Sequence, residues 1–325
     1  MKIQVIGAGS WGLALSRLLA IRGHAVHLWC REEDDPDRLR ATRRSDAFLP
    51  GVVLPDTVAV AREVDTTAVM VVLAVPSHAM RTVLRNLPIP EGTILVSVAK
   101  GIENDTLMRM SEVIAACAPD RPVAVLSGPS HAEEVARDLP ASVVVAGANP
   151  AVSGSVQDAF FGPTFRVYTS DDMVGVELGG ALKNVIAIAA GACDGLGLGD
   201  NAKAALITRG LAEISRLGVA CGASPLTFAG LSGMGDLIVT CASRLSRNRR
   251  VGEAIARGET LDAVLAASPM VAEGVRTARA AHVLAHRHNV DMPITRAVYE
   301  VLYEGASPRA AVAALMQRDA RPERG

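Results

Sequence analysis

The chain opens on the apolar run KIQVI, which leads directly into GAGSWG at residues 7–12 and then into helical periodicity over residues 13–21. The glycine spacing G-x-G-x-x-G between a strand and a helix is typical of a phosphate-binding turn. Gly7 permits the tight turn, Gly9 lets a pyrophosphate approach the backbone, and Gly12 lets helix and strand pack closely. The free N–H groups of the helix start then face the phosphates. The pattern predicts a dinucleotide-binding unit, and a glycine-rich turn without a ligand is the weaker alternative.

Short β-branched runs alternate with helical patterns through the first half of the chain. Several of these runs are apolar on both faces, as parallel strands covered by helices are. The alternation predicts an α/β fold, with a Rossmann-type doubly wound sheet over residues 1–170. The expected strands cover residues 2–6, 25–29, 68–74, 93–98, 122–126, 142–146 and 165–168.

The strand signal fades from about residue 173 onward, where Ala-rich segments with helical periodicity follow one another. A chain of 325 residues is long enough for two domains. We therefore expect a C-terminal all-α domain over residues 171–325 that carries the substrate and catalytic groups, with the boundary near residues 169–172. The expected helices cover residues 175–191, 202–218, 248–257, 261–267, 277–288, 294–303 and 308–317.

Composition excludes several classes of protein. The formal net charge of -1 gives no basic excess that would attract nucleic acid or an anionic membrane. The five cysteines are dispersed without disulfide or zinc spacing, so we expect reduced thiols. The N-terminus shows no secretory signal, and Gly, Pro or charge interrupts the longest apolar runs. We expect a cytoplasmic protein without membrane insertion.

The end of the second expected strand bears on coenzyme choice. An acidic residue at this place holds the ribose hydroxyls of NAD, whereas an arginine can stack on adenine and pair with the 2′-phosphate of NADP. Arg31 is the first charged residue after the strand, and Glu32 follows it. The order favours NADP and leaves NAD open, and an exposed loop arginine is the alternative.

Three further loops follow expected strand ends, at residues 76–78, at Lys100 and at residues 128–130. The carboxyl ends of strands line the ligand crevice of an open α/β sheet, so Lys100 is placed to meet an anionic substrate or coenzyme. Ser130 and Glu133 also have the spacing of a capping box, which leaves Ser130 open between a helix cap and a ligand contact. His78 is best explained as a loop histidine.

The helical half contains GGALKNVIAIAAG at residues 179–191, where Lys183 and Asn184 are the only polar side chains. On a helix Lys183 shares its face with small residues, which predicts room beside it. A buried ammonium needs a carboxylate, a bound anion or a lowered pKa. Such a lysine can exchange a proton near neutral pH, and the alternative is a lysine that reaches water along an apolar surface.

Two polar islands interrupt the rest of this half. Asp236 lies in the glycine-rich segment GMGDL and could be the partner of Lys183. The segment SRNRR at residues 246–250 precedes a helix and suits a phosphate through Arg247 and free backbone N–H groups. For each segment taken singly there is a structural alternative: Asp236 as an ordinary turn residue, and the arginines of residues 246–250 as a solvated surface. We expect no metal site at the three histidines of residues 282–288, because no acidic or thiol ligand joins them at a suitable spacing.

These residues resemble the bacterial NAD(P)-dependent sn-glycerol-3-phosphate dehydrogenases over nearly the whole chain. The matching blocks are GAGSWGLAL from residue 7, VAKGIE from 98, LSGPSHAEEVA from 126, VELGGALKNVIAIAAGACDGLGLGDNAKAALITRGLAEISRLG from 176, SGMGDLIVTCASRLSRNRRVG from 232 and VAEGVRTA from 271. The long block that contains the lysine is highly specific, whereas G-x-G-x-x-G alone would not be.

The resemblance implies reversible hydride transfer between NADPH/NADP or NADH/NAD and the C2 carbonyl of dihydroxyacetone phosphate. The product, sn-glycerol 3-phosphate, would serve glycerophospholipid synthesis. In this scheme Lys183 is the catalytic acid and base, with Asn184 and Asp236 beside it. Substrate contacts are implied for Lys100, Gly128, Ser130, Lys183, Asp236, Ser246, Arg247 and Asn248. Coenzyme contacts are expected for the fingerprint residues Gly7, Gly9 and Gly12 and are implied for Ser10, Trp11, Arg31, Lys100, Ala132, Arg247, Val271 and Glu273.

One residue departs from the family pattern. His131 stands where the family more often has an aromatic side chain, and we expect it to alter packing and not chemistry. Two rival functions remain: another β-hydroxyacid-type dehydrogenase acting on a carboxylate substrate, and a nucleotide-sensing protein that has lost catalysis. The phosphate-suited segment disfavours the first rival, and the joint presence of Lys183, Asn184 and Asp236 disfavours the second. An exposed helical face could serve a homodimer.

Overall fold

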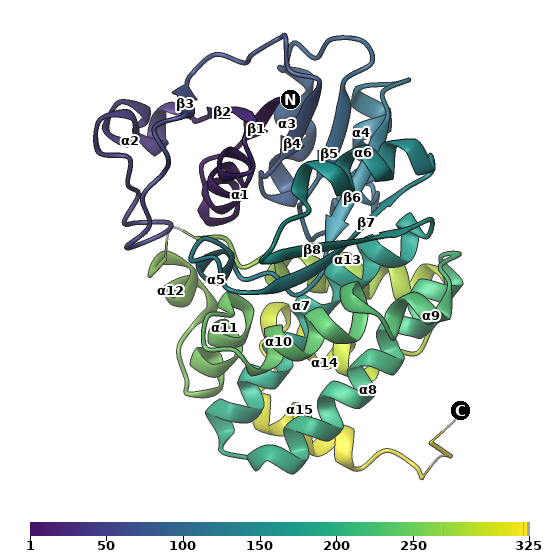
Figure 1. Ribbon diagram of the computed structural model, residues 1–325. Coiled ribbons are helices and arrows are strands. Elements are labelled where there is room, and N and C mark those ends of the chain that lie inside the picture. Colours follow the sequence, from purple (N-terminus) through teal and green to yellow (C-terminus); the bar gives the residue numbers. More distant parts are fainter. Residues whose placement is uncertain (269, 321, 324–325) are drawn as a thin grey trace.

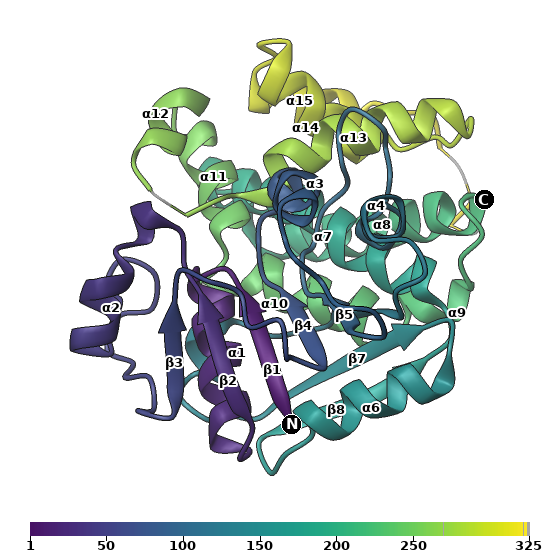
Figure 2. The same ribbon diagram turned by 90° about the horizontal axis from the view of Figure 1, so that it is seen from above.

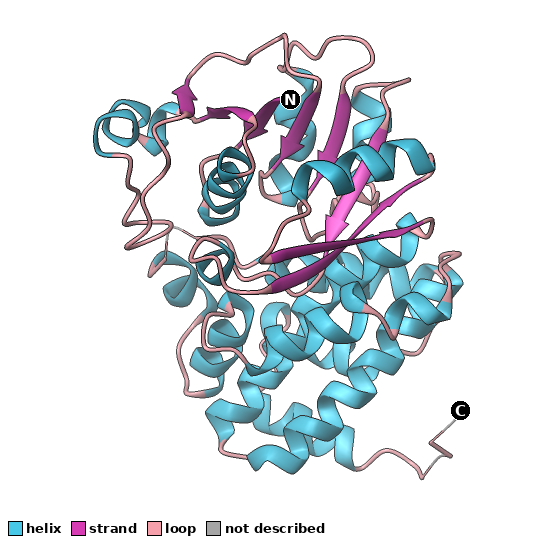
Figure 3. Ribbon diagram, in the orientation of Figure 1, coloured by secondary structure: helices cyan, strands magenta, loops and turns pink. Residues whose placement is uncertain are grey.

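The computed structural model describes residues 1–268, 270–320 and 322–323. A sheet covered by helices forms the N-terminal half, and helices alone form the C-terminal half (Figures 1 and 3). The strands of the single described sheet lie in the order β3-β2-β1-β4-β5-β6-β7-β8. Their bounds are β1 Lys2–Ile6, β2 Ala25–Trp29, β3 Val58–Ala61, β4 Met70–Leu73, β5 Ile94–Ser97, β6 Val123–Ser127, β7 Ala141–Gly147 and β8 Phe165–Ser170. The predicted fold class is confirmed.

The sheet differs from the prediction in two places. The short strand β3 was not predicted, and it pairs in parallel with β2 so that Val58 lies opposite Val26. β7 pairs antiparallel with β6, although the remaining strand pairs are parallel. A parallel return needs a crossover element that spans the sheet. The connection from β6 to β7 holds only α5 (Ala132–Val135), which is too short to make that crossover.

Helices cover both faces of the sheet, and the alternation of side chains along the strands divides the core accordingly. Ile3 and Val5 pack on the face covered by α1, α5 and α6, whereas Ile6 and Leu73 pack on the face covered by α3 and α4. Figure 2 shows α6 and α4 on different sides of the strands. The bounds of the other elements in this half are α1 Ser10–Ile21, η1 Glu32–Asp34, α2 Pro36–Thr42, η2 Ser77–Ala79, α3 Met80–Arg85, α4 Met110–Cys117 and α6 Pro150–Phe160.

The long helix α7 (Met173–Leu196) is the centre of the helical half and is buried along most of its length. The Asp172 carboxylate accepts a hydrogen bond of 2.8 Å from the Gly175 N–H at its start. Gly197, with φ of +68°, ends the helix in the left-handed conformation that favours glycine. The elements around it are α8 Gly199–Ala220, α9 Pro225–Phe228, η3 Leu231–Gly235, α10 Asp236–Ala242, α11 Arg247–Ala256, α12 Leu261–Ala266, α13 Glu273–Arg287, α14 Pro293–Tyr303 and α15 Pro308–Met316.

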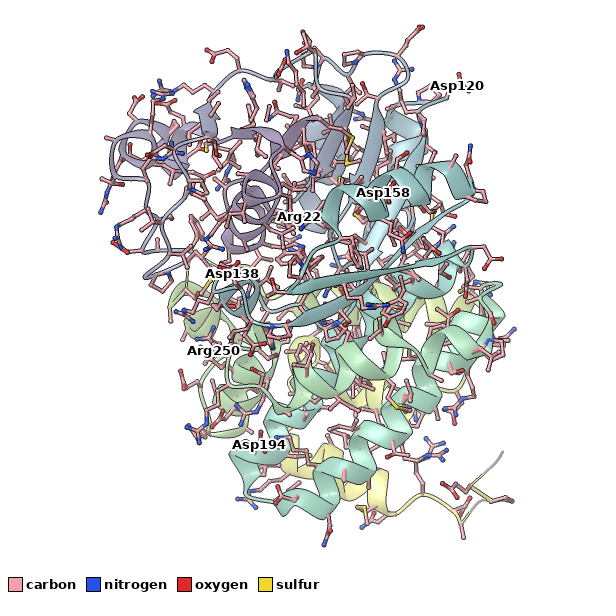
Figure 4. The ribbon with its side chains drawn as sticks, viewed as in Figure 1. Arg22, Asp120, Asp138, Asp158, Asp194 and Arg250 are labelled. Carbon is pink, nitrogen blue, oxygen red and sulfur yellow. The ribbon has the colours of Figure 1, made fainter. Side chains whose placement is uncertain are left out.

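Two glycines let α7 and α11 cross in close contact. A Cβ on Gly191 would lie 1.8 Å from the Arg249 carbonyl oxygen, and one on Gly252 would lie 1.8 Å from the Ile188 carbonyl oxygen. Beside this crossing Asp194, labelled in Figure 4, pairs with Arg249 at 2.6 Å and with Lys203 at 2.8 Å. The crossing fixes α11 against the helix that carries Lys183 and Asn184.

The expectation that no apolar run is suited to a bilayer needs a correction. Met173–Leu196 and the helical stretch Pro225–Ala242 both have the length and mean hydropathy of a membrane-spanning helix. In the first, 78% of the most apolar window is buried inside the protein, as in the core helix of a folded domain. Composition alone therefore does not separate a central core helix from a membrane span.

Candidate active site

A cleft of about 410 Å³ lies where the carboxyl end of the sheet meets the helical half. It is lined by residues from both halves, and the Gly7 N–H donates to the Trp29 carbonyl at 3.1 Å, which holds the fingerprint loop against the end of β2. Most of the expected site residues line it: Gly7, Gly9, Ser10, Trp11, Arg31, Lys100, Ser130, Ala132, Lys183, Asn184, Ser246, Arg247, Asn248, Val271 and Glu273. Gly12, Gly128 and Asp236 lie behind this lining.

The fingerprint glycines have the geometry that their spacing predicts. Gly7 has φ of +111°, and a Cβ on Gly12 would lie 1.8 Å from the Gly7 carbonyl oxygen, so α1 and β1 pack closely. A Cβ on Gly9 would have no atom within 4 Å, so no neighbouring group covers the Gly9 backbone where it lines the cleft. The buried Ser10 hydroxyl donates to the Phe48 carbonyl at 2.5 Å and ties the start of α1 to the loop before β3.

Lys183 is 6% exposed and lies between two acceptors on α10. Its Nζ is 2.7 Å from Asp236 Oδ1 and 2.5 Å from Thr240 Oγ1. The predicted partnership of Lys183 and Asp236 is therefore confirmed. Thr240 was missed because Asp236 was assigned to a turn. Asp236 is in fact the first residue of α10, so Thr240, four residues later, lies one helical turn further along the same face.

A second lysine shares the same aspartate. Lys100 Nζ lies 2.8 Å from Asp236 Oδ2 and 2.8 Å from the Gly128 carbonyl oxygen, to which it donates. It also lies 3.4 Å from Ser130 Oγ. One buried carboxylate thus holds two ammonium groups, so the centre carries a net positive charge where it borders the cleft.

Burial and charge act in opposite directions on this cluster. Burial lowers the pKa of Lys183 to about 8; the Asp236 charge opposes that shift and the Lys100 charge adds to it. Burial alone would raise the pKa of Asp236, but Lys100 and Lys183 hold it below its usual value. The cluster therefore contains an ionised carboxylate and a lysine able to gain or lose a proton near neutral pH.

The small residues near Lys183 do not leave open space, contrary to the prediction. A Cβ on Gly179 would lie 2.7 Å from the Ser232 carbonyl oxygen, and one on Gly180 would lie 2.5 Å from Ser127 Oγ. The glycines instead let η3 and the end of β6 approach α7. This close approach brings α10, and with it Asp236, to the lysine.

Asn184 and Asn248 join the two halves behind the cleft. Asn184 Nδ2 donates to the Lys100 carbonyl at 3.1 Å, and its Oδ1 accepts from Asn248 Nδ2 at 2.8 Å. Asn248 Oδ1 in turn accepts from the Gly274 N–H at 2.9 Å. Both amides are buried. This chain of hydrogen bonds links the loop after β5 to α7, α11 and α13.

The start of α11 presents the predicted phosphate-binding segment to the cleft. Ser246 caps the helix by accepting from the Arg249 N–H at 3.2 Å. Arg247 Nη1 donates to the Val271 carbonyl at 3.2 Å, which directs this side chain along the cleft wall. Burial lowers the pKa of Arg247, and the charges of Glu133 and Glu273 oppose that shift.

Glu273, at the start of α13, reaches across to the nucleotide-binding half. Its carboxylate accepts from the Ser77 N–H at 2.8 Å and from Ser77 Oγ at 2.6 Å. Burial raises the pKa of Glu273, and the Ser77 hydrogen bonds oppose the shift. Ser77 was not singled out from the sequence, although the loop that contains it was.

Of the two roles left open for Ser130, the helix cap is excluded by the structure. The helix α5 starts at Ala132, and the residue that precedes it is His131. The Ser130 hydroxyl instead donates to the Gly128 carbonyl at 2.9 Å, which shapes the loop beside Lys100. His131 lines the cleft, where burial and then the Lys183 charge lower its pKa. His78 also lines the cleft.

Comparisons with known proteins find relatives along nearly the whole chain. Two family models match: the NAD-dependent glycerol-3-phosphate dehydrogenase N-terminus over residues 2–153 and the corresponding C-terminus over residues 172–313. The glycerol-3-phosphate dehydrogenase (NAD(P)+) of Moorella thermoacetica is 55% identical over 97% of this chain and 96% of its own length. The enzyme of that name from Pelotomaculum thermopropionicum is 56% identical over 98% and 93%.

A solved structure shows the same fold over nearly the whole chain. The crystal structure of glycerol-3-phosphate dehydrogenase from Coxiella burnetii superimposes with a TM-score of 0.94. It is 39% identical in sequence, and the match covers 98% of this chain and 99% of that one. With both family models matched and whole-length relatives above 50% identity, this chain belongs to the NAD-dependent glycerol-3-phosphate dehydrogenase family.

Proposed function

We propose that this chain catalyses the reversible reduction of dihydroxyacetone phosphate to sn-glycerol 3-phosphate with NADPH or NADH. The observation that carries the proposal is the buried Lys183 paired with Asp236 at a cleft bordered by a dinucleotide fingerprint. Relatives that carry this activity in their names match the chain over nearly its whole length. The product is the glycerol backbone of glycerophospholipids, so the reaction serves their synthesis.

The fingerprint loop fits a dinucleotide. The bare backbone at Gly9 accommodates a pyrophosphate, and the first N–H groups of α1 point to it. When bound, the nicotinamide supplies or takes up the hydride that is exchanged at C2 of the substrate. The side chains proposed to hold the coenzyme are Ser10, Trp11, Arg31, Lys100, Arg247 and Glu273, together with the backbone of Gly7, Gly9, Gly12, Ala132 and Val271.

Lys183 is the proposed proton donor. As C2 of dihydroxyacetone phosphate is reduced, the ammonium gives a proton to the carbonyl oxygen and becomes a neutral amine. In the opposite direction the neutral amine removes the proton of the C2 hydroxyl. An ammonium has three N–H groups, and Asp236 and Thr240 accept two of them, so the third serves the substrate oxygen. Positioned acid–base groups of this kind contribute about 10² to 10⁴ in rate.

The substrate phosphate is proposed to lie at the start of α11. Arg247 can bind two phosphate oxygens, and the N–H groups of a ten-residue helix favour an anion there. Lys100 and Ser130 are then on the glycerol side, with Gly128 shaping their loop. Ser246 and Asn248 complete this end of the cleft. Asn184 acts as a positioning residue, because its amide is bonded to the Lys100 carbonyl and to Asn248.

The test is the oxidation of NADPH and of NADH by the purified chain, followed by absorbance, with dihydroxyacetone phosphate as substrate. We expect turnover with this ketone and formation of sn-glycerol 3-phosphate, and no turnover with a 2-keto acid that lacks phosphate. Turnover of the keto acid alone would favour the β-hydroxyacid dehydrogenase alternative. Coenzyme binding without turnover of either substrate would favour the nucleotide-sensing alternative.

The cytoplasmic location and a homodimeric state are also proposals. Both were expected from the sequence, and both can be measured. Cell fractionation with a tagged chain tests the location, and light scattering coupled to size-exclusion chromatography tests whether the particle has twice the 33.9 kDa mass of one chain.

A further inference from the structure

The adenosine end of the cleft contains an acidic residue that the sequence did not single out. Asp34 is the last residue of η1, three residues after Arg31, and both residues line the cleft. The hydrogen bond from the Gly7 N–H to the Trp29 carbonyl places this segment directly beside the fingerprint loop. In dinucleotide-binding folds this is where the ribose 2′ position of the adenosine lies.

Asp34 binds the guanidinium of Arg31 along its edge. Arg31 Nη2 lies 2.8 Å from Asp34 Oδ1, and Arg31 Nε lies 3.2 Å from Asp34 Oδ2. The Arg31 N–H also lies 3.3 Å from Asp34 Oδ2, so the carboxylate is anchored to the backbone as well. The Asp34 side chain is only 7% exposed, whereas that of Arg31 is 58% exposed. The aspartate is thus the enclosed partner, and the arginine is the partner that solvent reaches.

Glu32, which the sequence left as the residue for NAD, points elsewhere. Its carboxylate accepts from Arg62 Nε at 2.7 Å and from Arg62 Nη2 at 3.1 Å. Arg62 follows β3 and also pairs with Asp37 at 2.6 Å. Glu32 is absent from the residues that line the cleft, in the part of the chain that the structure describes. The acidic group available to the ribose is therefore Asp34.

We propose that Asp34 moderates the preference for NADP over NAD by competing with the 2′-phosphate for Arg31. With NAD, the 2′-hydroxyl donates to the Asp34 carboxylate and Arg31 keeps its partner. With NADP, Arg31 must leave Asp34 to meet the phosphate, and the dianion then faces the carboxylate. The inference rests on the proposed function in one respect, namely that the cleft takes an NAD(P) coenzyme.

The exposure of Arg31 limits the size of this effect. An ion pair with one exposed partner shifts an equilibrium by about twofold to fivefold, and the repulsion between carboxylate and phosphate adds to it. Asp34 therefore moderates the preference that Arg31 creates, and the chain accepts both coenzymes. Removing the charge of Asp34 should shift the selectivity toward the phosphorylated form by about tenfold.

The experiment measures calorimetric binding of adenosine 2′,5′-bisphosphate and of 5′-AMP to the wild-type chain and to three variants. Asp34→Asn keeps an acceptor for the Arg31 N–H but removes the charge. Arg31→Ala removes the phosphate partner, and Glu32→Gln is the matched control on the same segment. We expect the ratio of the two affinities to rise about tenfold in Asp34→Asn, to fall in Arg31→Ala and to stay within twofold in Glu32→Gln.

The kinetic preference, as the ratio of kcat/KM for NADPH and NADH, should move in the same directions. An unchanged affinity ratio in Asp34→Asn, or an equal shift in Glu32→Gln, would overturn the role of Asp34 and leave the proposed reaction intact. Binding of neither nucleotide to the wild-type chain would instead overturn the coenzyme cleft on which the inference rests.

Discussion

At the scale of single residues, the site depends on one buried carboxylate, Asp236, that is shared by two lysines. Asp236 has two cationic partners, whereas Lys183 has one carboxylate and one hydroxyl. The positive charge of Lys100 disfavours the ammonium form of Lys183 and so lowers its pKa, which opposes the effect of Asp236. The result is a lysine whose pKa of about 8 lets both its ammonium and its amine form be populated near neutral pH.

This pKa predicts opposite pH dependences for the two directions of the reaction. Reduction needs the ammonium form of Lys183, so kcat should fall as the pH rises through about 8. Oxidation of glycerol 3-phosphate needs the neutral amine, so kcat should fall as the pH drops below about 8. Initial rates at saturating substrate and coenzyme in both directions test this. Parallel profiles in the two directions would contradict the assignment of Lys183 as acid and base.

Residue identities predicted the chemistry of this site better than its packing. An isolated lysine in an apolar helix marked Lys183, because a buried ammonium has to be compensated, and Asp236 was correctly selected as its partner. The role of Ser130 was not resolved, because a capping box depends on where the helix starts, and α5 starts one residue later than the cap requires. The contact between Arg31 and Asp34 depends on a local turn that periodicity does not show.

At the scale of elements, the crossing of α7 and α11 is the contact that positions the phosphate end against the lysine. Gly252→Ala should lower the free energy of unfolding by about 3 kcal/mol, because the new methyl group meets backbone atoms that cannot move aside. Gly154→Ala on α6 is the matched control, since its Cβ meets nothing within 4 Å and alanine favours a helix. Urea unfolding followed by circular dichroism measures both. Equal stability of the two variants would contradict the close crossing.

Most strands of the sheet were predicted from the sequence, including the four-residue strands β4 and β5, whereas β3 and the segment from α9 to α10 were not. β1 and β2 agree with their predicted bounds. β1 ends just before the first glycine of the fingerprint, and β2 ends just before the charged run that starts at Arg31. β3 has four residues and a single alternation, which is too little for a pattern to identify. The segment from α9 to α10 was also missed, because its glycines indicate a turn. One of those glycines, Gly233, instead lets η3 fold back on α9, since a Cβ there would lie 2.2 Å from the Phe228 carbonyl oxygen.

At the scale of the whole molecule, buried carboxylates of the helical half bind helix starts of the nucleotide-binding half. Glu177 of α7 accepts from the Ser111 N–H at 2.7 Å and from Ser111 Oγ at 2.6 Å, and it pairs with Arg109 at 2.5 Å. Glu273 makes the same pair of hydrogen bonds with Ser77, at the start of η2 beside the cleft. These two ties and the Asn184 bridge hold the helical half against the sheet.

Glu177→Ala should therefore weaken the coupling between the halves as well as the stability. The change removes the acceptor of the Ser111 N–H and hydroxyl and leaves Arg109 paired with Glu112 alone, so we expect a loss of about 3 kcal/mol. We also expect the unfolding transition seen by calorimetry to broaden or divide. The control is Asp138→Asn, which breaks the exposed pair with Arg17 and should change stability by less than about 1 kcal/mol. Asp138 is labelled in Figure 4 near the junction of the halves. A change in stability of less than about 1 kcal/mol in both variants would contradict the role of Glu177 in joining the two halves.

The most direct measurement is the turnover number of Lys183→Met with dihydroxyacetone phosphate, taken at a coenzyme concentration shown by fluorescence titration to be saturating. Lys100 still pairs with Asp236 in this variant, so the fold and the coenzyme affinity should be retained. Turnover should fall by at least about 10² because the proton donor is gone. Turnover within a few-fold of the wild-type value, in a variant that still binds coenzyme, would contradict the claim that the reaction depends on this amine.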